Sequence, residues 1–296
     1  MTLLKEIYRN LRTRYPGLEG LRPTRAVFGN RVSWSKNLQY LRYHAECRRA
    51  FLRAGKTVIS PAADLATRFE RDGYGIFTPV YESGLLETIR SKCDEMVRAG
   101  HIRVLPEEDW FIQFSNNAAR IPEIFRLITP EVAAVAEACF RSHFKIYSSE
   151  LYRIVPTSTP PKLSGLWHTD NYPPGIYKIM VYLTECDRSS GALGLHTKEN
   201  TRRLLRRGFF DRFQADPFRD ELETGGIRVE GPAGTVLFWN SNLIHRANPP
   251  VAGHHDVVAF KLLPSCEPWS AHLSRMGARV DYGLRCEQTP SDPSAD

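Results

Sequence analysis

The spacing of apolar residues changes about halfway along the chain. Up to about residue 145, apolar positions recur every three or four residues, as they do in helices that bury one face. The helices expected from this spacing cover residues 3–15, 37–54 and 129–143, with two more in 61–100 on either side of a short strand at Tyr74–Phe77. Thr129 is a good N-cap for the helix that follows, and Pro130 suits its first turn.

Beyond residue 145, segments rich in β-branched and aromatic residues predict strands. The expected strands are Lys145–Val155, Tyr177–Leu183, Thr235–Trp239 and Asp256–Leu263. Helices that precede a set of strands are typical of an α+β chain with a mainly β core, here a β-sandwich or jelly roll with N-terminal and flanking helices.

Three parts of the chain are expected from these patterns. Residues 1–60 form a basic helical N-terminal extension, residues 61–286 form the main domain, and residues 287–296 are a polar tail that we expect to be disordered.

The extension holds 13 Lys/Arg against 3 Asp/Glu, a net charge of +10, so the rest of the chain sums to −3 within the total of +7. This asymmetry predicts contact with an anionic partner, such as a membrane surface, a charged glycan or nucleic acid, and a solvated basic face is the alternative.

The chain carries no apolar run of the roughly 20 residues that cross a bilayer, and its N-terminus lacks the apolar core of a signal peptide. We therefore expect a cytoplasmic protein, with peripheral contact at the inner face of the membrane. The six cysteines are scattered without a CxxC pair, which favours unpaired thiols over disulfides or a zinc site.

Two segments carry the candidate chemistry. In WHTDNYPPG, residues 167–175, His168 and Asp170 are two positions apart, so at the end of a strand both point to one side. In GPAGTVLFWNSNLIHRANPP, residues 231–250, a predicted strand is followed by His245. Antiparallel jelly-roll strands can bring these segments together. Two imidazoles and one carboxylate are the ligand set of non-haem iron(II) oxygenases, and they leave positions open on the metal.

Other chemistries fit the sequence less well. Two histidines and one aspartate can also bind zinc, but no HExxH helix is present to support a metalloprotease. The nucleophile elbow GxSxG and the nucleotide-binding patterns GxGxxG and Walker A are absent too. A non-catalytic metal-binding jelly roll, or an inactive relative that keeps the fold as a scaffold, remains as an alternative.

At these residues the chain resembles the phytanoyl-CoA dioxygenase-like branch of the iron(II)/2-oxoglutarate oxygenases. The resemblance runs from about residue 65 to 263. It rests on FERDGYGIFTPV (69–80), WHTD (167–170), SGALGLH (190–196) and GTVLFWNSNLIHRANP (234–249). It implies a double-stranded β-helix (a cupin-like jelly roll) with iron(II) at its mouth, and 2-oxoglutarate and O₂ as co-substrates. Because halogenating relatives lack the carboxylate supplied by Asp170, the resemblance also implies a hydroxylase.

One position departs from the family pattern. The family usually carries Arg or Lys about ten residues after the distal histidine, where it pairs with the far carboxylate of 2-oxoglutarate, but this chain has His255. A neutral imidazole cannot form the bidentate pair that arginine forms. A protonated His255 is one candidate for this role. The others are cations from neighbouring strands, namely Lys178, Lys261, Arg153 and Arg246.

The substrate prediction rests on basic residues. The segment TKENTRRLLRRGFFDRF (197–213) stacks Arg202, Arg203 and Arg206 along one helical face, which suits phosphate or carboxylate. Trp167, beside the first metal ligand, is a further candidate contact to the substrate.

We expect hydroxylation of an unactivated C–H bond in an anionic small molecule or glycolipid, specifically the acidic inner-core sugar Kdo on a lipid A precursor. A soluble hydroxylase of secondary metabolism is the alternative, and a nucleic-acid oxygenase is suggested by charge alone, because no nucleic-acid module is present.

Overall fold

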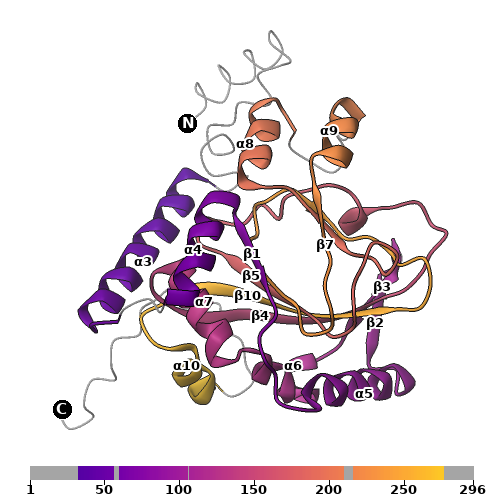
Figure 1. Cartoon of the computed structure of the whole chain (residues 1–296), viewed down its shortest axis with the longest axis horizontal. Helices are drawn as coiled ribbons and strands as arrows, with labels where there is room; N and C mark the ends of the chain where they lie inside the picture. The colour runs from indigo at the N-terminus through magenta and orange to yellow at the C-terminus, as the bar shows by residue number, and fades with distance from the viewer. Residues whose placement is uncertain (1–32, 57–59, 106, 210–215, 277–296) are drawn as a thin grey trace, which may run out of the picture.

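Two antiparallel sheets form the centre of the domain in the computed structural model, which describes residues 33–56, 60–105, 107–209 and 216–276 (Figure 1). The large sheet has the order β1-β8-β5-β10-β4-β3-β2, and the small sheet has the order β7-β6-β9. The strands are β1 Tyr74–Phe77, β2 Ile102–Leu105, β3 Glu108–Phe114, β4 His143–Ile154, β5 Tyr177–Tyr182, β6 Leu193–Leu195, β7 Ile227–Val229, β8 Val236–Asn240, β9 His245–Arg246 and β10 His255–Ser265.

Helices surround the sheets. They are α3 Trp34–Arg53, α4 Ser60–Asp72, α5 Leu85–Arg98, α6 Asn117–Arg120, α7 Pro130–Phe140, α8 Lys198–Arg206, α9 Arg219–Thr224 and α10 Trp269–Met276, with 3-10 turns at Pro122–Leu127, Leu163–Gly165 and Asp216–Phe218. The expected N-terminal helix at residues 3–15 and the expected disordered tail lie outside the described residues.

Side chains alternate between the two faces of the large sheet, as the pleat of a strand requires. On β5 and β10, Ile179, Val181, Val258 and Phe260 join the main apolar core, which is completed by residues of α5 and α7. The opposite face packs against the small sheet through a second apolar cluster that includes Val257. This face, between the two sheets, also contains the cavity described below.

The predicted helix after Thr129 is present as α7. The Thr129 hydroxyl accepts a hydrogen bond from the backbone N–H of Val132, and Pro130 begins the helix. These contacts satisfy an N–H group that would otherwise be unpaired at the helix start, and Pro130 has no N–H to satisfy there. The helix ends at Phe140, followed by Arg141 in the left-handed region with φ 54°.

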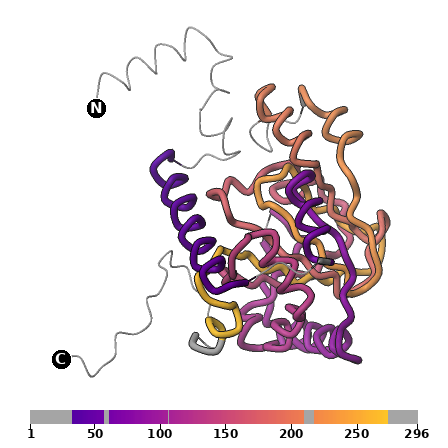
Figure 2. The backbone as a smooth tube through the Cα atoms, turned by 60° about the vertical axis from the view of Figure 1, so that its left-hand side comes forward, coloured from indigo at the N-terminus to yellow at the C-terminus, as the bar shows by residue number. Residues whose placement is uncertain are grey.

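Helix α3 belongs to the predicted N-terminal extension, yet it packs on the main domain. Its buried residues Tyr43, Cys47 and Phe51 recur every four positions and lie on the side that faces β4 and β10. Figures 1 and 2 both show α3 lying along one flank of the domain. The opposite side of α3 is exposed and mixed, because Leu38, Leu41 and Leu52 lie there among polar and charged residues.

The jelly-roll prediction is confirmed, and the four long predicted strands correspond to β4, β5, β8 and β10. The sequence reading missed β2, β3, β6, β7 and β9, most of which are too short to show a period of two. Cys93, Cys139 and Cys186 are free thiols as predicted, whereas the prediction was wrong for Cys266, which is disulfide-bonded. The spacing of cysteines along a chain does not reveal their pairing in space. Among the described residues, no helix combines the length and the apolar content needed to cross a membrane.

Candidate metal centre

The two predicted metal-binding segments lie side by side. His168 and His245 form an antiparallel β-bridge, in which the N–H of each residue donates to the carbonyl of the other at 3.0 and 2.9 Å. The backbone N–H of Asp170 donates to the carbonyl of Ser241 at 3.3 Å. These backbone contacts fix the spacing of residues that are 77 positions apart in the sequence.

The three candidate ligand side chains converge on one point. The Nε2 atoms of His168 and His245 lie 3.9 and 3.7 Å from Oδ1 of Asp170, and the three candidate ligand atoms all lie within 4.8 Å of one another. Both imidazoles are almost fully buried. These separations suit one ion held by two nitrogens and one oxygen on a single face, with the opposite face open.

Hydrogen bonds set which nitrogen of each imidazole is available. Nδ1 of His168 donates to the carbonyl of Leu166 at 2.7 Å, and Nδ1 of His245 donates to the carbonyl of Leu243 at 2.8 Å. In the neutral imidazole, a proton on Nδ1 leaves the Nε2 lone pair free. Both rings therefore have the tautomer and the orientation that a metal ligand needs.

Charges around Asp170 keep it ionised. Burial by itself raises the pKa of this carboxyl group, but Lys178, His245 and His168 outweigh burial and hold the pKa well below its usual range. Nζ of Lys178 lies 2.5 Å from Oδ2 of Asp170, so one carboxylate oxygen is held by the lysine while the other faces the imidazoles. Burial, followed by the neighbouring His168, lowers the pKa of His245, which keeps it neutral and able to bind a metal.

The triad opens into a cavity of about 210 Å³ between the two sheets, here called the metal cavity. Its polar wall on the large sheet contains Lys178, Lys261, Glu150 and Tyr152. Lys261 forms an ion pair with Glu150, and the Tyr152 hydroxyl donates to the same carboxylate. Glu150 and Tyr152 were not singled out from the sequence, because their alternation in β4 resembles that of any half-buried strand.

His255 lines the metal cavity at the start of β10, but it carries no charge there. It is 1% exposed, and its Nδ1 lies 2.8 Å from the hydroxyl oxygen of Thr184. Burial, followed by the charge of His254, lowers the pKa of His255 to about 4. The structure therefore brings this predicted residue to the cavity as a neutral imidazole.

The two arginines considered for the same role are held elsewhere. Arg153 makes a bidentate ion pair with the fully buried Asp256, at 2.7 Å for both contacts, and a further contact with Asp94. Arg246 makes a bidentate pair with Glu223 at 2.5 and 2.7 Å. Neither arginine lines the metal cavity.

The predicted substrate contacts also lie away from the metal cavity. Helix α8 forms as predicted, but its Arg203 pairs with Glu221, and Arg202 and Arg206 are exposed without lining the cavity. Trp167 is 4% exposed in a separate apolar cluster, and its indole N–H donates to Glu223 at 3.0 Å. Its stacked contact with the Arg246 guanidinium, 4.6 Å from the ring centroid, gives it a packing role.

The loop after Asp170 is fixed by a side chain from the second candidate metal-binding segment. Oδ1 of Asn242 accepts from the N–H of Tyr172 at 2.9 Å, and its Nδ2 donates to the Tyr172 carbonyl at 2.8 Å. Asn242 thus binds the backbone of one ligand-bearing loop from the other, and it helps to hold the two loops in register.

The fold and this donor set together define a class: the protein is a non-haem iron(II) oxygenase of the 2-oxoglutarate-dependent type. Residues 69–252 match the phytanoyl-CoA dioxygenase (PhyH) family, and the chain belongs to that family. A comparison with curated proteins gives no match.

Solved structures share the fold at low sequence identity. The 2-oxoglutarate-dependent carbocyclase SnoK from nogalamycin biosynthesis aligns with a TM-score of 0.56 at 17% identity, over 75% of this chain and 94% of that one. EctD from S. alaskensis with bound Fe aligns at 0.54 and 17% identity, over 79% and 83%. HygX from Streptomyces hygroscopicus, with nickel, 2-oxoglutarate and hygromycin B bound, aligns at 0.51 and 17% identity, over 68% and 86%.

Proposed function

We propose that the protein hydroxylates an unactivated C–H bond of an anionic substrate, with iron(II) held by His168, Asp170 and His245. The observation that carries this proposal is the convergence of the Asp170 carboxylate with the Nε2 atoms of His168 and His245, which lie 3.9 and 3.7 Å from its Oδ1. Iron(II) in such a site supplies the oxidising chemistry, with 2-oxoglutarate and O₂ as co-substrates. A carboxylate in the third position occupies the place that a halide needs, which favours hydroxylation over halogenation.

We further propose that Lys261 holds the far carboxylate of 2-oxoglutarate. Among the described residues that line the metal cavity, the cationic side chains are Lys178 and Lys261, since His255 is neutral. Lys178 contacts the candidate metal ligand Asp170, whereas the partner of Lys261, Glu150, is not among the candidate metal ligands. Burial lowers the pKa of Lys261, but Glu150 and Tyr172 raise it by a larger amount. The net pKa is therefore above its usual value, and the ammonium stays charged.

Lys178 has a different role in this proposal. By holding Oδ2 of Asp170, it orients Oδ1 toward the two imidazoles, and it is therefore a positioning residue for the metal ligand. Its ammonium also lies 5.0 Å from the ring centroid of Trp239, which confines it further.

The size of the metal cavity limits how the substrate binds. About 210 Å³ is below the usual range of small-molecule sites, roughly 300–1,000 Å³, so 2-oxoglutarate takes most of the enclosed space. The substrate then presents its reacting carbon at the cavity mouth while its remainder stays outside. An acidic sugar such as Kdo at the head of a lipid A precursor fits this description, and so does a soluble metabolite. Two solved structures with the same fold contain an organic molecule besides 2-oxoglutarate, namely hygromycin B in HygX and 5-hydroxyectoine in EctD.

The test begins with the visible spectrum of the full chain under anaerobic conditions. Weak charge-transfer absorption that needs both iron(II) and 2-oxoglutarate, and that is lost in His168→Ala and Asp170→Ala, is the expected result. Iron binding without any response to 2-oxoglutarate would overturn the co-substrate assignment. Succinate release is then compared between Kdo-bearing lipid A precursors and soluble anionic metabolites, and stimulation by neutral compounds alone would overturn the anionic substrate class.

A further inference from the structure

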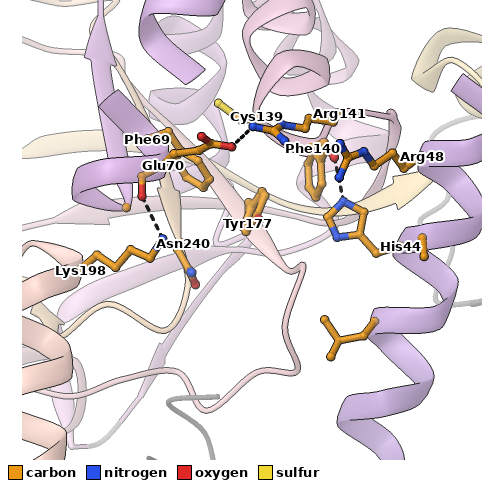
Figure 3. Close-up of a pocket in the computed structure, with 13 residues that line it drawn as sticks. His44, Arg48, Phe69, Glu70, Cys139, Phe140, Arg141, Tyr177, Lys198 and Asn240 are labelled. Atoms are coloured by element: carbon orange, nitrogen blue, oxygen red, sulfur yellow. Dashed lines mark hydrogen bonds and ion pairs between the residues drawn. The ribbon is translucent and has the colours of Figure 1, made fainter. Parts of the chain in front are cut away.

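A second cavity lies where α3 meets the main domain (Figure 3). Its volume is about 410 Å³, larger than that of the metal cavity, and we call it the α3 cavity. Helix α3 contributes His44 and Arg48 to its lining, and the domain contributes Arg141 and Lys198. Figure 3 shows the α3 residues on one side, Lys198 on the other, and open space between them.

The α3 cavity is separate from the metal cavity. Tyr177 of β5 and Asn240 of β8 line the α3 cavity, whereas their chain neighbours Lys178 and Trp239 line the metal cavity. Successive side chains of a strand point to opposite faces of the sheet, so the paired strands β5 and β8 lie between the two spaces. An occupant of the α3 cavity would therefore not be in contact with the metal ligands.

The lining of the α3 cavity is strongly cationic. Arg48, Arg141 and Lys198 face one carboxylate among the described lining residues, Glu70, which pairs with Arg141. The Lys198 ammonium donates to the backbone carbonyl of Glu70 at 2.9 Å, so this contact leaves its charge uncompensated. Burial, followed by the charge of Arg202, lowers the pKa of Lys198, and together they outweigh the opposing charge of Glu70.

Contacts with the domain fix α3 so that Arg48 reaches this space. The Nε2 atom of His44 lies 2.8 Å from the carbonyl of Phe140, and Arg48 follows one helical turn later on the same face. Gly175, in the loop after Asp170, lies close to the His44 ring: a Cβ atom added at Gly175 would lie 3.4 Å from Nδ1 of His44. No carboxylate contact to Arg48 occurs within the described part of the chain.

The domain side of the cavity has an aromatic wall. The rings of Phe140 and Tyr177 are stacked with centroids 4.4 Å apart, and Phe69 meets Tyr177 edge-on at 4.8 Å. Such a surface favours a flat or apolar group next to the cations.

Arg141 supports a binding role through its backbone. Arg141 directly follows the last residue of α7 and has a φ of 54°, in the left-handed region. Helices commonly have glycine at this position, because the left-handed conformation costs other residues about 1 kcal/mol or more. The chain keeps an arginine there, and its side chain lines the cavity. Strain of this kind is often retained where a side chain is needed.

From these observations we propose that the α3 cavity binds a small organic anion. Its phosphate or carboxylate group contacts Arg48, Arg141 and Lys198, and its apolar part lies on Phe140 and Tyr177. The family match covers residues 69–252, so α3 and its Arg48 lie outside it, whereas Arg141 and Lys198 lie inside. The proposal stands independently of the oxygenase reaction.

Phenyl phosphate and inorganic phosphate are the probes, titrated into the full chain by calorimetry with EDTA present to remove metal. We expect phenyl phosphate to bind more tightly than inorganic phosphate because of the aromatic wall. Arg48→Ala and Lys198→Gln should each weaken binding about tenfold, the usual loss for one charge-assisted hydrogen bond. Arg42→Ala removes an exposed α3 cation that does not line the cavity, and Lys261→Met removes a cation of the metal cavity, so both should bind as the parent does.

Circular dichroism of each variant shows whether it is folded before its affinity is compared. The proposal fails if phenyl phosphate does not bind at low salt, if Arg42→Ala weakens binding as much as Arg48→Ala, or if Lys261→Met abolishes it. Vesicles of phosphatidylglycerol form a separate arm. Sedimentation with these vesicles that depends on Arg48, without binding of phenyl phosphate, would assign the cations to a lipid headgroup and overturn the small-anion proposal.

Discussion

Lys178 and Lys261 are direct cross-strand partners on β5 and β10, yet they take different carboxylates. Lys178 contacts the metal ligand Asp170, and Lys261 contacts Glu150 on β4. Two ammonium groups on adjacent strands repel each other unless each has a counter-ion, and the site supplies one for each. This division of partners is the basis for proposing metal positioning for Lys178 and co-substrate binding for Lys261.

Replacement of Lys261 by methionine should weaken 2-oxoglutarate binding on the order of 10- to 100-fold, because a charge-assisted contact to a carboxylate is lost. The measurement is an anaerobic titration of the charge-transfer absorption with 2-oxoglutarate at saturating iron(II). Iron(II) affinity should stay close to that of the parent, and calorimetry with iron alone is the control. Unchanged 2-oxoglutarate affinity in Lys261→Met would assign the far carboxylate to another group.

Lys178→Met should instead weaken iron(II) binding, on the order of 10- to 100-fold, which is the usual effect of losing a contact that orients a metal ligand. The affinity is measured by competition with a chromogenic chelator. Lys178→Arg, which keeps the charge, is the matched control and should recover part of the affinity. If Lys178→Met bound iron normally and lost only 2-oxoglutarate, the roles of the two lysines would be exchanged.

Arg153→Met should destabilise the fold by about 3–5 kcal/mol, because Asp256 is left as a buried charge without its guanidinium partner. Urea unfolding followed by circular dichroism gives the free energy of unfolding. The double variant Arg153→Met/Asp256→Leu removes both charges and should regain most of the loss. A single variant as stable as the parent would contradict the importance of this pair.

Acid should destabilise the protein partly through His255. Its pKa is about 4 in the folded protein against 6.5 for an unperturbed histidine, so the unfolded chain binds the proton more readily. The stabilisation is complete above pH 6.5 and is lost as the pH falls from 6.5 toward 4, and it amounts to about 3 kcal/mol.

Urea unfolding of the parent and of His255→Gln across this pH range measures the effect. The variant should lose less stability on acidification, since glutamine does not titrate. Parallel pH profiles for the two proteins would show that His255 does not contribute.

Local patterns in the sequence were sufficient to select the three candidate metal ligands, which the structure brings together, and to predict most of the regular structure. His168 and Asp170 share a side because they are two residues apart, and the strand before His245 is visible in its own composition. The cap at Thr129 depends only on the residues that follow it. Each of these features is set by neighbours in the chain, so each could be predicted.

The tertiary structure decided which charges meet in the cavity. Lys178, Lys261 and Arg153 are all basic residues on strands, and a register shifted by one residue would exchange the faces they occupy. Pairing between β4, β5 and β10 directs the two lysines to the metal cavity and Arg153 to Asp256. The α3 cavity likewise depends on the packing of α3 against β4 and β10, which brings His44 to the end of α7. These relationships depend on pairing between distant segments, which the order of residues along a single strand or helix does not specify.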